Sequence, residues 1–202
     1  MKNTGILSVL LVSLFLVSGW MLAVPAAFAA GSDILVLPTP DKQGGKPLMQ
    51  ALALRKSTRA FSDAALSQQE LSNLLWATWG VTRPDGRRTA PTAMNKQQVE
   101  VFAAMGSGVW RYNGEAHTLE KVLARDTRKD FGGWPLTLVY AAEEGPFGAM
   151  HLGSLYQNAG LYCASAGLNN VVKATGVKVL QDELTLPSGY KIMIVQSVGM
   201  PE

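Results

Sequence analysis

The stretch FGAMHLGSLYQNAGLYCASAG, residues 147–167, decides which fold the rest of the chain can form. It is apolar on nearly all sides of a helix, and it is rich in glycine and alanine, which let another backbone approach closely. We therefore expect one long central helix that is buried on every side. Its small residues also suit packing at a subunit interface.

Segments on both sides of this helix predict strands. VEVFAAM (99–105) and GVWRYN (108–113) flank a Gly-Ser turn and predict a hairpin, while LTLVYAA (136–142) and YKIMIVQSVGM (190–200) read as buried strands. Residues 117–132 predict a short helix followed by a charged loop. Helices and strands are mixed without a regular strand–helix–strand series, so the predicted fold class is α+β.

Two further helices are predicted before the hairpin. An apolar spacing of three and four residues starts at Pro47, a residue that the first turn of a helix tolerates. Ser67 and Glu70 form a capping box, and Gly80 ends the apolar pattern that follows them. Residues 81–96 are rich in turn-forming residues and read as a loop.

The N-terminus has the pattern of a secretory signal peptide, residues 1–29. A basic start precedes an apolar run over residues 6–24, and small residues stand before a predicted cut after Ala29. The alternative is an uncleaved anchor, because the run is nearly long enough to span a membrane. We expect export to the periplasm or the extracellular space, an N-terminal arm over residues 30–46, and one domain over residues 47–202.

The composition is that of a globular protein, with 48% hydrophobic and 16% charged residues. The net charge of +3 comes without a basic run or stripe, so nucleic acid is not expected as a partner. Cys163 is the only cysteine and lies in an apolar helical pattern, which predicts a buried, inert thiol. His117 and His151 lack partners at metal-ligand spacing, so we expect no metal site. No side chain stands out as a catalytic nucleophile, acid or base.

The segment RKSTRAF, residues 55–61, gathers three cations around a hydroxyl group. On its own, the simpler interpretation is a helix end, because cations in a last turn are favoured by the helix dipole. The functional interpretation is a phosphate site, in which arginine offers a planar fork and serine adds a donor. If the chain is extended here, Arg55, Ser57 and Arg59 point to the same side.

A second candidate is RTAPTAMN, residues 88–95. Pro91 stiffens this loop, and Asn95 carries both a donor and an acceptor, so the loop could hydrogen-bond the edge of a flat heterocycle. The alternative is an ordinary loop that leads into a strand. Taken alone, neither this loop nor the cation-rich segment settles a function.

The order of these stretches carries a resemblance. R-[KR]-S-x-R-x-F is followed by a capped Leu-Leu-Trp helix, then R-T-A-P-[ST]-A-x-N, a strand-rich middle, and a long helix that ends A-x-G-L. In this, roughly residues 47–200 resemble the nitroreductase family of FMN-dependent oxidoreductases, and most of all its small single-domain branch that includes the SagB-type dehydrogenases. The resemblance implies an α+β sandwich with a central, mostly antiparallel sheet flanked by helices. It also implies an intertwined homodimer with FMN at the subunit interface.

The resemblance implies these cofactor-binding residues: Arg55, Lys56, Ser57, Arg59, Pro91, Thr92, Ala93, Asn95, Leu168 and Asn169. The group at 55–59 matches positions that contact the FMN phosphate and ribityl chain. The group at 91–95 matches the loop beside the isoalloxazine ring, and residues 168–169 begin the segment that passes the ring near its reactive nitrogen. Many family members also grip the phosphate with basic residues after the last strand. Because the sequence ends at Pro201-Glu202, we expect either weaker FMN binding or compensation by Lys96 or Lys173.

These features predict an exported FMN-dependent oxidoreductase that passes two electrons to a quinone, a nitroaromatic or a similar flat acceptor. The electron donor is left open between NAD(P)H, a quinol and a redox protein, and export disfavours NAD(P)H. One alternative is a ligand-binding module that has kept the fold and lost the flavin. Another is a SagB-like oxidase that makes heterocycles in a peptide, against which export argues.

Overall fold

The computed structural model describes residues 33–202. The predicted signal peptide, residues 1–29, lies outside the described residues, as do the first residues of the predicted arm. Within residues 33–202, the helices are too short or too polar to cross a membrane.

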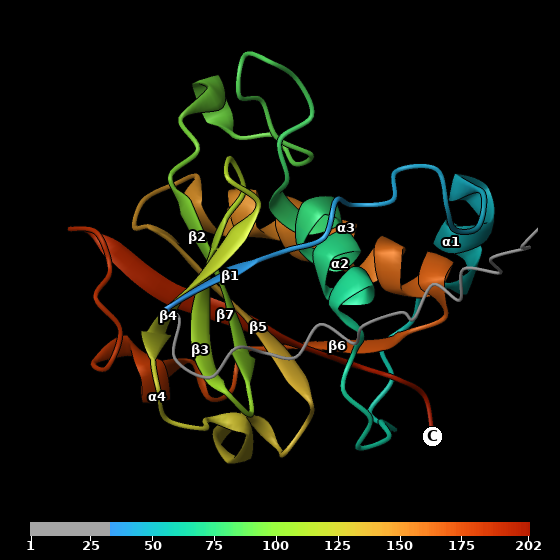
Figure 1. The fold of residues 1–202 in the computed structure, drawn as a ribbon. Coiled ribbons are helices and arrows are strands. Elements are labelled where there is room, and N and C mark those ends of the chain that lie inside the picture. The colour runs from blue at the N-terminus through green and yellow to red at the C-terminus, as the bar shows by residue number, and fades with distance from the viewer. Residues whose placement is uncertain (1–32) are drawn as a thin grey trace, which may run out of the picture. The chain divides into compact units, whose positions relative to one another are not determined.

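In the described part of the chain, seven strands form one sheet in the order β1-β4-β3-β2-β5-β7-β6 (Figure 1). All neighbours in this sheet pair antiparallel. The strands are β1 (Ile34–Val36), β2 (Val99–Met105), β3 (Gly108–Asn113), β4 (Thr118–Leu123), β5 (Leu136–Glu143), β6 (Asn169–Lys173) and β7 (Tyr190–Gly199). The predicted hairpin is confirmed, because Met105 pairs with Gly108 across a two-residue turn.

The described helices are α1 (Leu48–Leu54), α2 (Gln68–Trp79), α3 (Gly148–Ala166) and α4 (Val177–Gln181), with single 3-10 turns at η1 (Ala93–Asn95) and η2 (Arg128–Phe131). The capping box of α2 is confirmed: the Ser67 side chain accepts from the Glu70 amide, and the Glu70 carboxylate accepts from the Ser67 amide at 2.8 Å. The long helix α3 ends at Gly167, whose left-handed backbone suits glycine.

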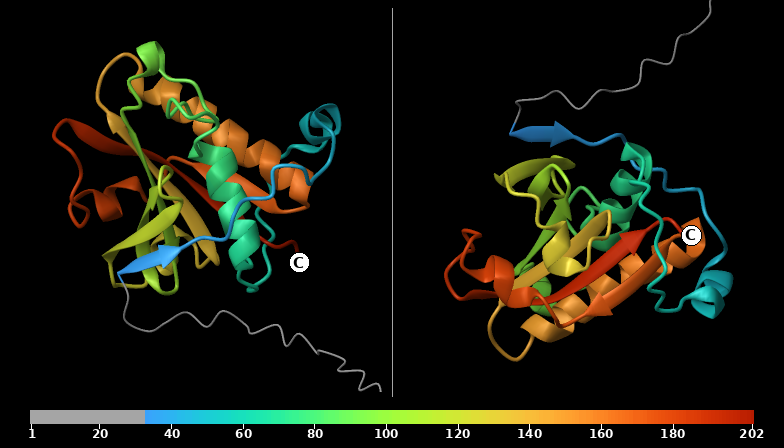
Figure 2. Two further views of the ribbon diagram at one scale, coloured as in Figure 1. Left: turned by 45° about the horizontal axis from the view of Figure 1, so that its top comes forward. Right: turned by 90° about the horizontal axis from the view of Figure 1, so that it is seen from below.

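The sheet separates two hydrophobic cores because strand residues alternate between its faces. On one face, Val101, Leu138 and Tyr140 pack with residues of α2 and α3. On the other face, Phe102 and Val139 pack with residues of η2 and α4. Figure 2 shows α2 and α3 together on one side of the sheet and α4 on the opposite side. The structure is therefore an α+β sandwich with a central antiparallel sheet, as predicted.

The long helix α3 corrects one expectation. Its inner face is buried, with Leu155, Ala159 and Cys163 inaccessible to solvent. Its outer face is not, because Met150 is 66% exposed and Gln157 is also exposed. The apolar pattern therefore does not bury this helix on every side within one chain. Its role at a subunit interface stays a prediction.

Residues 117–132 hold no α-helix, so the predicted short helix is wrong. Thr118–Leu123 form β4, which pairs with β3 on one side and with β1 on the other. Leu119 is fully buried while Glu120 is exposed, an alternation that suits a strand. The segment contains residues that favour a helix, but its pairing with β1 and β3 outweighs this helix propensity. Strand β6 was likewise not predicted as a strand.

The N-terminal arm is fixed to the domain by more than β1. The Ser72 hydroxyl donates to the Pro38 carbonyl at 2.6 Å and lies 2.7 Å from Nε2 of His117. The Tyr112 hydroxyl lies 2.9 Å from Nδ1 of the same ring. Burial lowers the pKa of His117, so its neutral form is favoured in this cluster. Leu37 is buried beside these contacts, and the arm is therefore ordered from β1 onward.

Candidate functional site

The segment RKSTRAF leaves α1 at Arg55 and runs beside β6 without regular secondary structure. The Thr58 amide donates to the Asn170 carbonyl at 2.8 Å. In return, the Asn169 side-chain amide donates to the Ala60 carbonyl at 2.6 Å. These two bonds hold the backbone of the segment in place, so its charged side chains stand on a fixed support.

The segment's cations have no counter-ion in the described part of the chain. The side chains of Arg55, Lys56, Ser57 and Arg59 are exposed, and none of them makes a hydrogen bond or ion pair with another described residue. A fourth cation lies close by: burial, and then the positive charge of Arg59, lower the pKa of Lys173. Unpaired cations gathered around a hydroxyl form a donor set that suits a phosphate.

Three of the predicted cofactor-binding residues meet in one cavity of about 210 Å³ beside this segment. They are Lys56, Leu168 and Asn169. Lys46, which is hydrogen-bonded to Ser165 of α3, also lines it, so the cavity has two lysines and an apolar part that includes Leu168. The structure thus brings the predicted groups at 55–59 and 168–169 together.

The loop at 88–97 is held in a strained conformation. Met94, Asn95 and Gln97 all have left-handed backbones, with φ of 52°, 54° and 53°. For a residue other than glycine this conformation costs about 1–2 kcal/mol, although asparagine tolerates it better than most. The surrounding structure must therefore hold the loop, and strain of this kind is often found at functional sites.

The contacts that hold the loop come from α3 and from the loop itself. Nε2 of His151 accepts a hydrogen bond from the Ala93 amide at 2.9 Å, and the Asn158 side chain donates to the Thr89 carbonyl at 3.2 Å. His151 is only 6% exposed. Because Nε2 accepts, the neutral ring carries its proton on Nδ1, which has no hydrogen-bond partner among residues 33–202.

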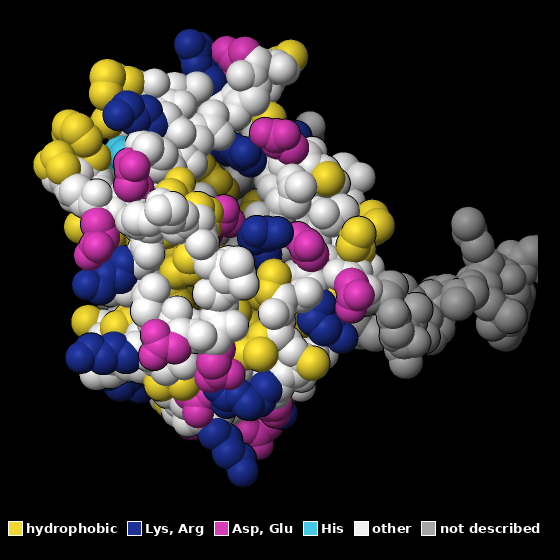
Figure 3. Space-filling view, turned by 90° about the vertical axis from the view of Figure 1, so that its left-hand side faces the viewer, with side chains coloured by type: hydrophobic (Ala, Val, Ile, Leu, Met, Phe, Trp, Pro, Cys, Tyr) yellow, Lys and Arg dark blue, Asp and Glu magenta, His cyan; other side chains and the backbone are white. Residues whose placement is uncertain are grey.

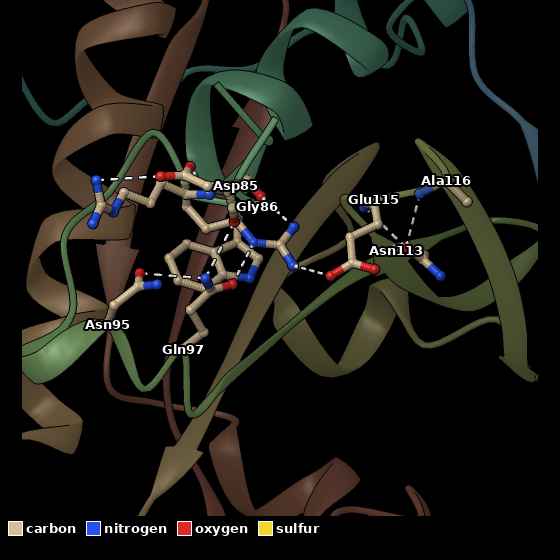
Figure 4. Close-up of polar contacts among 10 residues, drawn as sticks. Asp85, Gly86, Asn95, Gln97, Asn113, Glu115 and Ala116 are labelled. Atoms are coloured by element: carbon tan, nitrogen blue, oxygen red, sulfur yellow. Dashed lines mark hydrogen bonds and ion pairs between the residues drawn. The ribbon is translucent and has the colours of Figure 1, made fainter. Parts of the chain in front are cut away.

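Gln97 joins the loop to Arg88, and Figure 4 shows its side chain beside Asn95 and Gly86. Nε of Arg88 donates to the Gln97 side-chain oxygen at 2.7 Å. The Gln97 side-chain amide in turn donates to the Asn95 side chain at 3.3 Å and to the Gly86 carbonyl at 3.2 Å. The predicted site residue Asn95 is therefore oriented through a chain of side-chain hydrogen bonds that begins at Arg88, whose side chain is nearly buried.

The loop and the cation-rich segment lie on different sides of α3. The side chain of Arg55 passes Gly160, where an added Cβ would lie 3.8 Å from Cδ of the arginine. The loop is bound at His151, nine positions earlier, which is about 180° around the helix and about 14 Å along it. Figure 1 shows the same separation: the green loop and the teal segment after α1 lie toward opposite ends of α3. One chain therefore does not bring residues 91–95 to residues 55–59.

Sequence reasoning missed His151 and Gln97 as residues of the site. His151 was considered only as a metal ligand, and residues 33–202 hold no cluster that could bind a metal ion. A lone histidine in an apolar helix gives no signal for a contact with a loop that lies 58 positions away in the chain. Cys163 is buried as predicted, and burial strongly raises its pKa, so its thiol is not a candidate nucleophile.

Comparisons with known proteins identify the family and the fold. The family model described as the nitroreductase family matches residues 52–200. A nitroreductase-type protein of Methanocaldococcus jannaschii is 30% identical over 97 residues, which is 45% of this chain and 48% of that protein. The match thus spans about half of that relative's length.

Solved structures show the same fold. A nitroreductase-type protein from Ralstonia eutropha JMP134 is 37% identical with a TM-score of 0.78, covering 85% of this chain and 90% of that one. A nitroreductase with bound FMN from Bacteroides fragilis shares the fold at a TM-score of 0.55, with 13% identity, 78% coverage of this chain and 89% of its own. The narrower likeness to SagB-type dehydrogenases stays a prediction. The chain therefore belongs to the nitroreductase family.

Proposed function

We propose that this member of an oxidoreductase family depends on FMN and passes electrons to a quinone, a nitroaromatic or a similar flat acceptor. The observation that carries the proposal is the donor set of RKSTRAF. Its three cations and the Ser57 hydroxyl have no side-chain partner in the described part of the chain, and they stand on a backbone fixed by β6.

The residues present fit FMN. Arg55, Ser57 and Arg59 would hold its phosphate, with Lys173 beside Arg59 as an added positive charge. Lys96 lies in the other loop, beside His151, so Lys173 is the better placed of the two to add positive charge near the phosphate. The side chain of Asn95 offers a donor and an acceptor to a ring edge.

Bound FMN would supply the two-electron chemistry, so the protein needs no catalytic nucleophile of its own. The chain's own residues would bind and orient. The cation-rich segment fixes the phosphate end, and the strained loop presents Thr92 and Asn95 in one conformation. His151 and Gln97 hold that conformation before any ligand arrives, which lowers the entropy lost on binding.

We further propose that the site is completed by a second copy of this chain. The loop and the segment lie on different sides of α3, so residues 91–95 of one copy would meet residues 55–59 of the other. Exposed apolar side chains stand near both parts: Leu48 and Met49 are 64% and 75% exposed in α1, and Met150 is 66% exposed at the start of α3. A two-fold arrangement would pair such surfaces on both copies at once.

Export remains part of the proposal, through the N-terminal signal pattern. An exported enzyme works where NAD(P)H is scarce, so a quinol or a redox protein is the proposed electron donor. N-terminal sequencing of the protein recovered from outside the cytoplasm tests this, and a mature start after Ala29 is the expected result. Figure 3 shows one face of the molecule with Lys/Arg and Asp/Glu side chains interleaved, which does not favour a nucleic-acid backbone as a partner.

The flavin is tested by adding FMN to the purified protein, desalting, and recording the visible spectrum. We expect a retained flavin band near protein stoichiometry that is lost in Arg55→Ala. Arg83→Ala removes an exposed arginine from the loop after α2 and serves as the matched control, with the band unchanged. A folded protein that retains no flavin would favour the alternative, a ligand-binding module with the nitroreductase fold.

The shared site is tested by mixing two variants that each fail to retain FMN. Arg55→Ala damages the segment, and Asn95→Gly removes the loop side chain while keeping its left-handed backbone. If each site takes one part from each copy, exchange of subunits creates mixed dimers with one intact site. The flavin content should then rise to about a quarter of the sites, because half of the dimers are mixed and half of their sites are intact. No recovery after proven exchange would contradict a shared site.

A further inference from the structure

A cavity opens where two neighbouring strands of the sheet diverge. β2 and β3 pair only from Phe102 opposite Arg111 to Met105 opposite Gly108, next to their hairpin turn. Beyond that point β2 stays paired with β5, and β3 stays paired with β4. The gap between them, which we name the splay cavity, measures about 360 Å³. This is within the size range of sites for small molecules.

One wall of the splay cavity carries a nearly buried cation. The Arg88 side chain is 11% exposed, lies 5.3 Å from the centre of the Trp79 ring, and is fixed at Nε by Gln97. Its carboxylate partner, Glu115, is 3.4 Å away and 75% exposed. A charge-assisted hydrogen bond normally measures about 2.7–2.9 Å. The guanidinium is therefore oriented tightly by neutral groups and only loosely by its counter-ion, so a second carboxylate could replace Glu115 (Figure 4).

Another wall carries a carboxyl group without a hydrogen-bond partner. Glu100 lines the same cavity and is partly buried, and no residue in the described range hydrogen-bonds its carboxyl. The neighbouring Arg111 is bound to Glu120 at 2.7 Å, so its charge is already matched. The pKa of Glu100 is raised, mainly by burial. The positive charge of Arg111 acts against this shift, and the negative charge of Glu120 adds to it. A donor from a ligand would satisfy this carboxyl.

We propose that the splay cavity binds a small zwitterion, with its carboxylate on Arg88 and its ammonium group on Glu100. The two side chains have opposite charge and line one cavity. Arg88 has only a long ion pair with the exposed Glu115, and the carboxyl of Glu100 has no hydrogen-bond partner in the described range, so a ligand with a single charge would satisfy only one of the two. The size of the cavity suits a molecule of the size of an amino acid. This site is separate from the proposed flavin site, which uses the cation-rich segment and the other end of the loop.

A ligand bound in the splay cavity would also affect the conformation of the strained loop. Arg88 contacts Gln97, and Gln97 contacts Asn95, so a ligand on Arg88 acts on the residue that we assign to the flavin ring. This consequence rests on the proposed function, whereas the binding itself does not. The test therefore measures binding without flavin.

The test is isothermal titration of the full chain with ω-amino acids of increasing length, from glycine through 4-aminobutanoate to 6-aminohexanoate. Acetate and ethylamine are the single-charge controls. We expect at least one ω-amino acid to bind about tenfold or more tightly than either control, because two charge-assisted contacts replace one. The preferred length reports the separation of the two charges. If no ω-amino acid binds better than acetate and ethylamine, the proposal is wrong.

Two substitutions should act in opposite directions. Glu100→Gln removes the charge that holds the ammonium group and should weaken the best zwitterion about tenfold, to the level of acetate. Glu115→Gln removes the competing carboxylate from Arg88 and should tighten binding. Glu144→Gln, an exposed residue paired with Lys191 outside the cavity, is the matched control and should change nothing. Unchanged affinity in folded Glu100→Gln, or weaker binding in Glu115→Gln, would overturn the assignment.

Discussion

Replacing His151 by alanine should release the loop at 88–97 without unfolding the sheet. The Nε2 atom of this buried ring is the acceptor for the Ala93 amide at 2.9 Å. After the substitution no side chain at position 151 can accept that bond. The loop also has left-handed backbones at Met94 and Asn95, and loss of a contact should allow this strained conformation to relax.

The size of the effect follows from the loss of one partly buried hydrogen bond. A fully buried donor left without its acceptor costs about 1–3 kcal/mol, or about a 5- to 150-fold easier local opening, and for this partly buried donor we expect the lower part of that range. Removal of the ring also leaves a cavity beside Phe147, whose ring stacks on that of His151 at 6.2 Å. Part of this loss is offset, because Nδ1 of the wild-type ring has no described partner and disappears with the ring.

Hydrogen exchange at the Ala93 amide measures this opening directly. We expect exchange to be accelerated by the factor above in His151→Ala, and to be partly restored in His151→Gln, whose side-chain oxygen can accept. His117→Ala is the control, because the other histidine holds the N-terminal arm and not the loop. If the Ala93 amide exchanges at the same rate in His151→Ala and in the wild type, the loop is held by Asn158 and Gln97 instead, and the reasoning about His151 is refuted.

Two further predictions concern stability. Burial lowers the pKa of His117 below its usual value of 6.5. As the pH falls through about 6.5, this histidine therefore becomes protonated in the unfolded chain before it does so in the folded chain, which favours unfolding. In urea titrations the free energy of unfolding should fall between about pH 7.5 and pH 5.5, and it should fall by less in His117→Gln. An equal loss in both proteins would contradict this. Gly133→Ala should cost about 1–2 kcal/mol for its left-handed φ of 84°. Gly108→Ala should cost more, because its added Cβ would also meet the Leu123 carbonyl oxygen at 2.2 Å; equal urea midpoints for the two variants would argue against that clash.

The parts of the fold that the sequence predicted correctly depend on short-range chemistry. Ser67 and Glu70 cap α2 through bonds between residues three apart, and such a bond can be inferred from the spacing alone. The hairpin after Met105 likewise forms around adjacent turn residues. The apolar run of α3 was long enough to exclude a strand, so its type and its bounds were both predictable.

The parts that sequence missed depend on partners far along the chain. β4 is a strand because it pairs with β3 on one side and with β1 on the other. The residues between positions 117 and 123 carry no local signal for this pairing. β6 is set by β7 in the same way. The predicted site residues lie in two groups, and their separation by α3 is a property of the whole fold, while their role in binding a cofactor stays a prediction. His151 belongs to the loop only through a contact that spans 58 positions.

The helix α3 contributes both to the core and to the candidate site. Successive residues of a helix are turned by about 100°, so neighbours in the sequence face different parts of the structure. Leu155 and Ala159 are core, while His151 and Asn158 hold the loop and Gly160 accommodates Arg55. If the protein retains flavin as we propose, a substitution in this helix could therefore abolish that retention either by damaging the site or by loosening the core. Loss of flavin alone does not separate the two. A local measurement, such as exchange at the Ala93 amide, does so because core damage accelerates exchange throughout the sheet, whereas damage to the loop contact accelerates it only in the loop.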